Sequence, residues 1–156
     1  MSAPGGTALA VAIESEGLRL PVARARLAAL AQAVLSAAGI RRALVSVAFV
    51  GARRMAALNR RHLGHRGATD IITFALGDDP ACGLVADVYI CPEVARRQAR
   101  DHGVGVREEV ARLVVHGMLH ACGWDHPDSD DRVASPMWRR QERLLQRFWI
   151  TSMSSA

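Results

Sequence analysis

Three histidines in the C-terminal third of the chain have the spacing of a metal site. They lie in the segment VVHGMLHACGWDH, as His116, His120 and His126. Residues four apart in a helix share one face, with Cβ atoms about 5–6 Å apart, so His116 and His120 can bind the same ion. Gly123 can adopt a positive φ and turn the chain, which brings His126 toward that ion. The spacing therefore predicts a zinc site made of three imidazoles.

The number of protein ligands indicates how such a metal is used. Three neutral imidazoles leave a fourth coordination position for water, whereas structural zinc sites are usually closed by four protein ligands. Water bound to zinc can become a nucleophile near neutral pH. Imidazole ligands also favour zinc over magnesium. We therefore expect one catalytic Zn²⁺ per chain.

The same spacing resembles the HExxHxxGxxH signature of metzincin proteases. The general-base glutamate of that signature corresponds to Gly117 in this chain. Glycine has no side chain that could take a proton from water at the metal. The pattern thus keeps a metzincin-like zinc helix but argues against peptide hydrolysis by the usual route. A metallohydrolase that acts on peptides or small molecules stays as an alternative.

The elements that must position these histidines form a single α+β domain in the sequence pattern. Apolar periodicity predicts a helix from about Arg107 to Ala121, which carries the first two histidines and ends before Gly123. The expected fold is a small mixed β-sheet packed with helices over residues 7–150, with disordered tails at 1–6 and 151–156. The order of the strands is not predicted. The other expected elements are strands at 9–13, 43–50, 69–74 and 84–90, helices from Pro21 to before Gly39 and at 53–61, 92–102 and 137–149, and a loop at 77–83.

Composition favours a cytoplasmic protein without a membrane segment. No apolar stretch approaches the roughly 18 residues that a membrane helix needs, and residues 1–6 lack the features of a signal peptide. Three cysteines without CxxC spacing argue against a disulfide framework. The net charge of +5 favours polyanionic partners such as nucleic acid. All 20 basic residues are arginine, which indicates codon bias as much as selection for RNA.

Three sequence blocks, taken together, resemble one known family. HGMLHACGWDH is similar to the HGxLHLxGYDH signature of the YbeY family of bacterial rRNA-maturation factors. LNRRHLGHRGATDIITF resembles the family's LNxxYRGxxxPTDVLSF block, and VADVYICPEVARRQA resembles its GDIVISPEVAxxQA block. The blocks occur in the family's order and cover most of the chain from Leu58 to His126.

This resemblance implies a function as well as a fold. It implies a zinc-dependent endoribonuclease that cleaves single-stranded RNA, matures rRNA and takes part in ribosome assembly or quality control. The expected partners are therefore RNA and the ribosome or its proteins. The metal ligands that it implies are His116, His120 and His126. The RNA cleavage site, the oligomeric state and the nucleophile, water or the RNA's own 2′-hydroxyl, are not determined by the sequence.

One position departs from the family pattern. The block that begins at Leu58 usually carries an arginine, thought to serve RNA cleavage, where this chain has Leu63. Leucine cannot bind a phosphate group. The candidate substitutes are Arg66, as a catalytic and RNA-binding residue, and Arg60 and Arg61 as RNA contacts. The departure also keeps open a third hypothesis, a non-catalytic assembly factor whose zinc orders the fold.

Two acidic residues and three tryptophans are further candidates for the catalytic or RNA-binding site. Asp70, after Thr69 in the second block, is either a catalytic carboxylate or a turn residue. Asp125 is either a carboxylate that orients a metal-bound imidazole or a plain turn residue. The tryptophans either stack on RNA bases or belong to the core; they are Trp124, Trp138 and Trp149.

Overall fold

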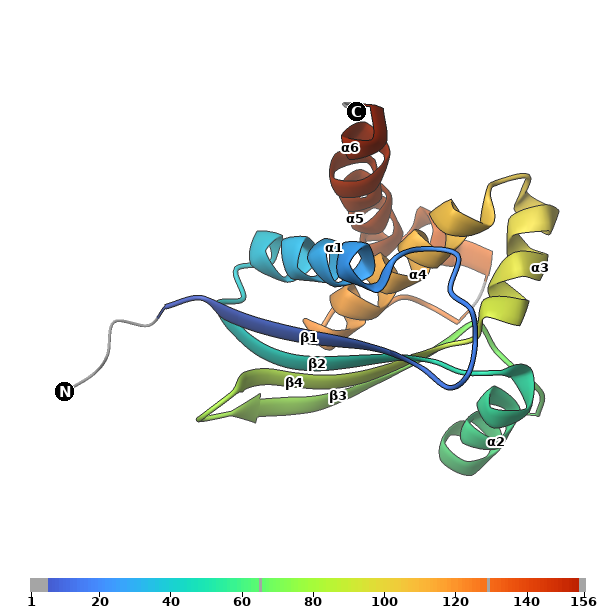
Figure 1. Ribbon diagram of the computed structural model, residues 1–156, viewed down its shortest axis with the longest axis horizontal. Coiled ribbons are helices and arrows are strands. Elements are labelled where there is room, and N and C mark those ends of the chain that lie inside the picture. Colours follow the sequence, from blue (N-terminus) through green and yellow to red (C-terminus); the bar gives the residue numbers. More distant parts are fainter. Residues whose placement is uncertain (1–5, 65, 129, 155–156) are drawn as a thin grey trace.

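The structure is a computed structural model that describes residues 6–64, 66–128 and 130–154. A four-stranded sheet is packed with helices in one α+β layer arrangement (Figure 1). The elements follow in the order β1 (Ala8–Ser15), α1 (Arg24–Ala37), β2 (Arg42–Phe49), α2 (Ala52–Leu63), β3 (Ile71–Asp79), β4 (Gly83–Ile90), α3 (Pro92–His102), α4 (Val106–Ala121), the 3₁₀ turn η1 (Asp130–Ala134), α5 (Pro136–Leu145), the π-helical turn η2 (Gln146–Ile150) and α6 (Thr151–Ser154). The predicted fold class is confirmed.

The sheet is mixed, as expected, and its strand order is β1-β2-β4-β3. Strands β1, β2 and β4 are parallel, and β3 pairs antiparallel with β4 through a hairpin. Strand β3 is therefore an edge strand. This position matters because β3 lies beside the helix that carries two of the histidines.

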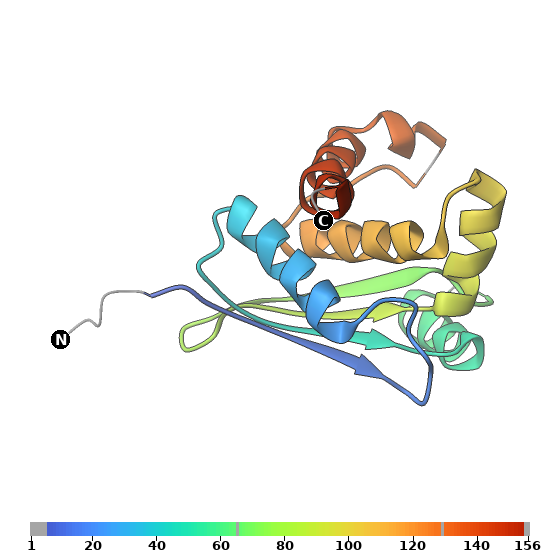
Figure 2. The same ribbon diagram turned by 45° about the horizontal axis from the view of Figure 1, so that its top comes forward.

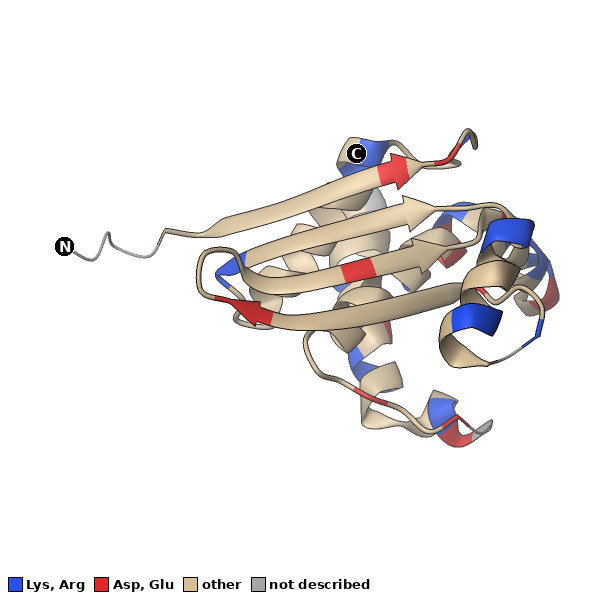
Figure 3. Ribbon diagram, turned by 90° about the horizontal axis from the view of Figure 1, so that it is seen from below, with Lys and Arg blue, Asp and Glu red and all other residues tan. Residues whose placement is uncertain are grey.

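Helices α1 and α4 cover one face of the sheet (Figure 2). The sheet side of this core consists of small and β-branched residues such as Val45, Val47 and Val88, all fully buried. Helix α4 also contacts α3 and α5, so it is enclosed on most of its circumference. The opposite face of the sheet is covered by α2 at one end, and the strands are visible over the rest of it (Figure 3).

A glycine sets how closely α4 approaches the sheet. Gly117 is buried, and a Cβ atom there would lie 3.0 Å from Val88 Cγ1 and 3.1 Å from Ile71 Cδ1. The Thr73 hydroxyl would be 3.5 Å away. The position that holds glutamate in metzincins therefore faces β3 and β4, and even a Cβ there would push against their side chains.

Strand β3 is longer than the sequence predicts. The stretch Gly77–Gly83 was expected to be a loop, because glycine and aspartate are poor strand formers. In the structure β3 continues to Asp79, which pairs with Gly83 after an irregularity between Ala75 and Asp78. The Asp79 carboxylate accepts hydrogen bonds from the N–H groups of Ala81 (2.7 Å) and Cys82 (3.0 Å). This capped turn and the hairpin pairing with β4 outweigh the preference of the single residues.

The C-terminal helix also differs from its predicted bounds. Helix α5 starts at Pro136. It is capped by Ser135, whose hydroxyl accepts the N–H of Trp138. The helical path then continues through η2 and α6 to Ser154, into the stretch expected to be a disordered tail. The Ser152 hydroxyl donates to the carbonyls of Phe148 and Trp149 there. The tail positions 1–5 and 155–156 lie outside the described residues. Over the described part of the chain, none of the helices has the length and apolarity to cross a membrane.

The close approach at Gly117 gives a stability prediction. Gly117→Glu places a carboxylate against Val88 and Ile71 without a partner, so it should lower the free energy of unfolding by about 3 kcal/mol or more. Urea unfolding of the metal-free protein measures this loss. Gly105→Ala is the control, because nothing lies within 4 Å of its added Cβ, and it should cost about 1 kcal/mol at most. A stable Gly117→Glu protein would contradict the tight packing.

Candidate metal centre

The three histidines come together as their spacing predicts. His116 and His120 lie one turn apart on α4, and the loop after Gly123, whose φ is +98°, returns His126 to their side. Their ring centroids are 4.6, 4.9 and 5.1 Å apart. One possible ligand atom from each ring lies within 4.8 Å of the other two. Small ring rotations would bring three nitrogens to the 2.0–2.1 Å that zinc requires.

Hydrogen bonds determine which nitrogen each ring can offer to a metal. Each Nδ1 atom faces an oxygen: Gln141 Oε1 for His116 (2.7 Å), the Trp124 carbonyl for His120 (3.0 Å) and the Pro127 carbonyl for His126 (2.9 Å). A carbonyl oxygen can only accept, so each Nδ1 carries the proton and donates it. In a neutral ring of this tautomer the Nε2 atom is unprotonated and free to bind a metal.

Burial keeps the central ring neutral. Removal from water lowers the pKa of His116 to about 4, although its bonds to Gln141 and the charge of Asp70 act in the opposite direction. Burial and the neighbouring His126 also lower the pKa of His120. A neutral imidazole needs no deprotonation before it coordinates a cation. The chemistry of this donor set therefore fits a zinc ion.

A buried polar network holds His116 in place. The Gln141 side chain, 1% exposed, accepts from His116 with its oxygen and donates to Glu142 Oε2 (3.1 Å) with its nitrogen, which fixes the orientation of the amide. Glu142 in turn accepts from Arg112 Nε (3.0 Å). Arg112 also pairs with Glu108 (3.3 Å) and with Glu109 (3.1 Å) on α4. The network connects α4 to α5 beside the histidines.

The histidines face a cavity of about 640 Å³. Its walls come from β3, the end of α3, α4, the loop after α4, η1 and α5. Asp70, Asp125 and Asp128 supply carboxylates, and Arg112 and Arg132 supply guanidinium groups. Such a cavity can hold a substrate with its reacting atoms against a metal ion and with an acid, a base or a cation beside them.

Some of the residues predicted for the site line the cavity, and others lie outside it. Asp70 lines the cavity, where its Oδ1 accepts the N–H of Ile71 (2.8 Å). Leu63, half exposed, also lines it. Arg60, Arg61 and Arg66 are exposed near the end of α2 and do not belong to the cavity wall.

Asp125 has a different contact from the one considered in the sequence. Its carboxylate accepts the main-chain N–H of His126 (2.9 Å), and the Nδ1 atoms of the three rings face other oxygens. Main-chain carbonyls orient two of the rings instead. The interpretation of Asp125 as the carboxylate that orients a metal-bound ring is therefore wrong.

Two residues that line the metal cavity, Gln141 and Arg132, were not predicted from the sequence. Gln141 lies on the inward face of α5 with Met137 and Leu144, so a polar residue at an apolar position was an available signal. Arg132, in the turn η1, gave no such signal. No ion pair joins it to any side chain that the structure describes. Arg112, by contrast, already faces three carboxylates.

Comparison with known proteins identifies the family of this site. Residues 12–149 match the family described as Endoribonuclease YbeY. The chain belongs to the YbeY family. The resemblance of the three sequence blocks is thereby confirmed, and it extends over most of the domain.

Individual YbeY relatives support the same assignment. The endoribonuclease YbeY of Frankia alni is 37% identical, with 95% of this chain and 87% of the relative covered. That of an Anaeromyxobacter species is 39% identical, with 88% and 71% covered. The solution structure of TM1509 from Thermotoga maritima has a TM-score of 0.62 at 26% identity, with 93% of each chain covered.

The polar network gives a prediction for metal affinity. Gln141→Met removes the acceptor of the His116 Nδ1 proton at similar volume, so the dissociation constant for Zn²⁺ should rise about 10- to 100-fold. Competition with a chromophoric chelator measures it. Gln98→Met is the matched control, because Gln98 lines the same cavity without a bond to a histidine ring. Equal zinc affinity in the two variants would contradict the role of Gln141.

Proposed function

We propose that this chain is a zinc-dependent endoribonuclease that cleaves single-stranded RNA in the maturation of rRNA. The single observation that carries the proposal is the convergence of three imidazoles, each with Nδ1 engaged, on one cavity of a YbeY-family domain. His116, His120 and His126 would hold one ion. Relatives of this chain bear the name endoribonuclease.

Residues around the cavity would have different roles in cleavage. Bound zinc supplies a Lewis acid for a phosphoryl oxygen and lowers the pKa of water. Asp70 lies in the cavity wall close enough to raise the pKa of His116, so its carboxylate is our candidate for accepting a proton. Gln141 and the carbonyls of Trp124 and Pro127 orient the rings.

Gly117 favours RNA over peptide as the substrate. A peptidase of the metzincin type needs a glutamate there, whereas this chain has a glycine in close contact with the side chains of Val88 and Ile71. Cations polarise a phosphodiester, and the nucleophile that attacks it can be the RNA's own 2′-hydroxyl. The missing glutamate is therefore less costly to a ribonuclease than to a peptidase.

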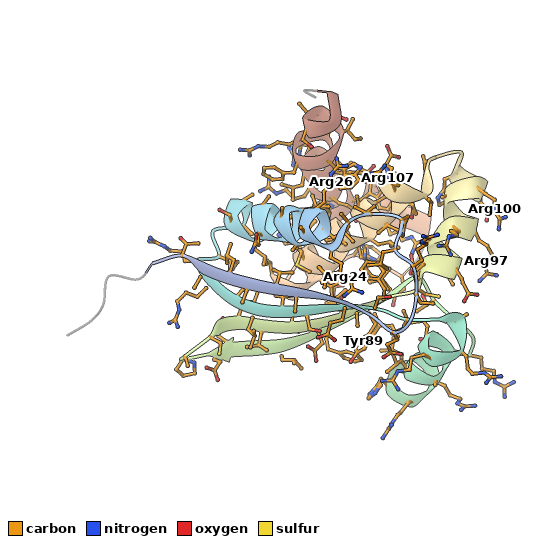
Figure 4. All side chains as sticks on the ribbon, viewed as in Figure 1. Arg24, Arg26, Tyr89, Arg97, Arg100 and Arg107 are labelled. Atoms are coloured by element: carbon orange, nitrogen blue, oxygen red, sulfur yellow. The ribbon has the colours of Figure 1, made fainter. Side chains whose placement is uncertain are left out.

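Arginines outside the cavity offer contacts to the RNA backbone. Arg60 and Arg61 end α2, and Arg66 follows in the loop before β3. Arg97 and Arg100 project outward from α3 (Figure 4). We propose the first three as RNA contacts that flank Leu63 at the cavity. A basic surface of this kind would bind the phosphate backbone of rRNA. We therefore propose that the protein acts on rRNA at the assembling ribosome, in the cytoplasm.

Cleavage of end-labelled single-stranded RNA by the purified protein tests the function. Cleavage should disappear after treatment with a chelator and return when Zn²⁺ is restored. His120→Ala should lower the rate by at least about 100-fold, because it removes one of three ligands. A duplex of the same sequence should be cut far more slowly.

Two controls make this test specific. His62→Ala removes an exposed histidine that lies outside the three-histidine group, and should leave cleavage unchanged. A protein that binds zinc and RNA but does not cleave would overturn the nuclease. It would favour the non-catalytic assembly factor.

The cavity wall gives a separate prediction for the arginine that takes over the role of the family arginine, which is Leu63 in this chain. Arg132→Ala should lower kcat/KM for RNA at least about tenfold, because Arg132 is the cavity arginine without a carboxylate partner among the described side chains. Arg66→Ala should cost less than about threefold, since exposed charges outside the site are screened. Steady-state kinetics measure both variants. A larger loss for Arg66→Ala would return the catalytic role to that residue.

A further inference from the structure

We propose that Trp124, Arg140 and Arg143 form a subsite for one nucleotide of single-stranded RNA, beside the metal centre. The subsite rests on the proposed nuclease function and specifies where the substrate strand continues. The three residues line a second, open hollow of about 460 Å³, where the C-terminal ends of α1 and α4 meet α5. This hollow shares none of its described lining residues with the metal cavity.

The exposure of the tryptophans distinguishes this one from the other two. Trp149 is 2% exposed and lies under the guanidinium of Arg26, so it belongs to the core. Trp138 is half-buried in the wall of the metal cavity. Trp124 is 38% exposed, although a large apolar side chain at a helix end could have packed inward. A flat aromatic surface open to solvent is the platform on which unpaired bases stack.

The charge of the hollow fits a phosphate group. Its described lining contains two arginines and no aspartate or glutamate. The nearby carboxylates face elsewhere: Asp125 lines the metal cavity, and Glu142 pairs with Arg112. Arg140 is partly engaged, because its Nη2 donates to the Ala37 carbonyl at 3.5 Å. Arg143 is exposed and forms no ion pair with a described side chain, so it is the freer cation.

The backbone of Trp124 connects the hollow to the metal centre. Its N–H donates to the Leu119 carbonyl (3.0 Å), and its carbonyl accepts from His120 Nδ1 (3.0 Å). The main chain is thus held on both sides, while the Trp124 side chain stays partly exposed. Only Asp125 separates Trp124 from His126, so their Cα atoms are at most about 7.6 Å apart. A strand that crosses the end of α4 would place adjacent nucleotides at the indole and at the histidines.

Binding of a fluorescein-labelled single-stranded 2′-O-methyl RNA octamer to the full chain tests the subsite. Fluorescence anisotropy should show that Trp124→Ala raises Kd about 5- to 100-fold, whereas Trp124→Phe stays within about threefold because stacking is retained. Arg143→Ala should weaken binding and lower the slope of log K against log salt by about 0.7, the value of one phosphate contact. Arg139→Ala, an exposed arginine of α5 that lines neither cavity, is the matched control and should change nothing.

The outcomes separate this subsite from the proposed function. Zinc affinity should be unchanged in Trp124→Ala, because the supporting carbonyl belongs to the main chain. Wild-type protein that cleaves RNA while Trp124→Ala binds the octamer equally well would overturn the subsite and leave the nuclease standing. Weaker binding by Trp124→Ala in a protein that never cleaves would support the subsite and overturn the nuclease. A loss in Arg139→Ala as large as in Arg143→Ala would also overturn the subsite.

Discussion

The structure depends most on the burial of helix α4. Its packing against the sheet on one side and against three other helices on the remaining sides leaves little of it in contact with solvent. Because Gly117 lets the helix approach β3 and β4 closely, His116 and His120 come to lie beside an edge strand. The metal cavity lies at this contact and is lined by Asp70, just before β3, and by residues of α5.

The parts of the fold that depend on local sequence could be predicted. The helix with its two histidines and the turn at Gly123 follow from residue spacing and from the conformational freedom of glycine. The strand order depends on pairing between distant segments, which periodicity does not encode. The extension of β3 to Asp79 depends on hairpin pairing with β4 across an irregular register, which residue preferences for loops obscure. The helical path beyond Thr151 continues α5, although its residues are small and polar.

The candidate site shows the same division. His116, His120 and His126 were found from their spacing, but what holds their rings was not. Gln141 lies 25 residues from His116 in sequence, and two of the oxygen acceptors are main-chain carbonyls that no side-chain pattern reveals. Likewise, Arg66 was favoured because it is near Leu63 in sequence, whereas Arg132 reaches the cavity from a distant turn. Proximity along the chain does not reveal a wall residue that comes from a distant element, and the role of Arg66 stays a prediction.

The ion pairs around Arg112 have a consequence for the electrical balance of the domain. One guanidinium faces three carboxylates, so this half-buried group carries a formal charge of −2 at neutral pH. A divalent ion on three neutral imidazoles would bring the opposite charge to the other end of the same hydrogen-bonded chain, through Gln141. The ion and the cluster would then compensate each other. Without the ion, the junction of α4 and α5 keeps an uncompensated negative charge, of which only the Glu109 carboxylate is buried. Binding of the ion would therefore favour the docking of α5 on α4, and that docking would favour binding of the ion.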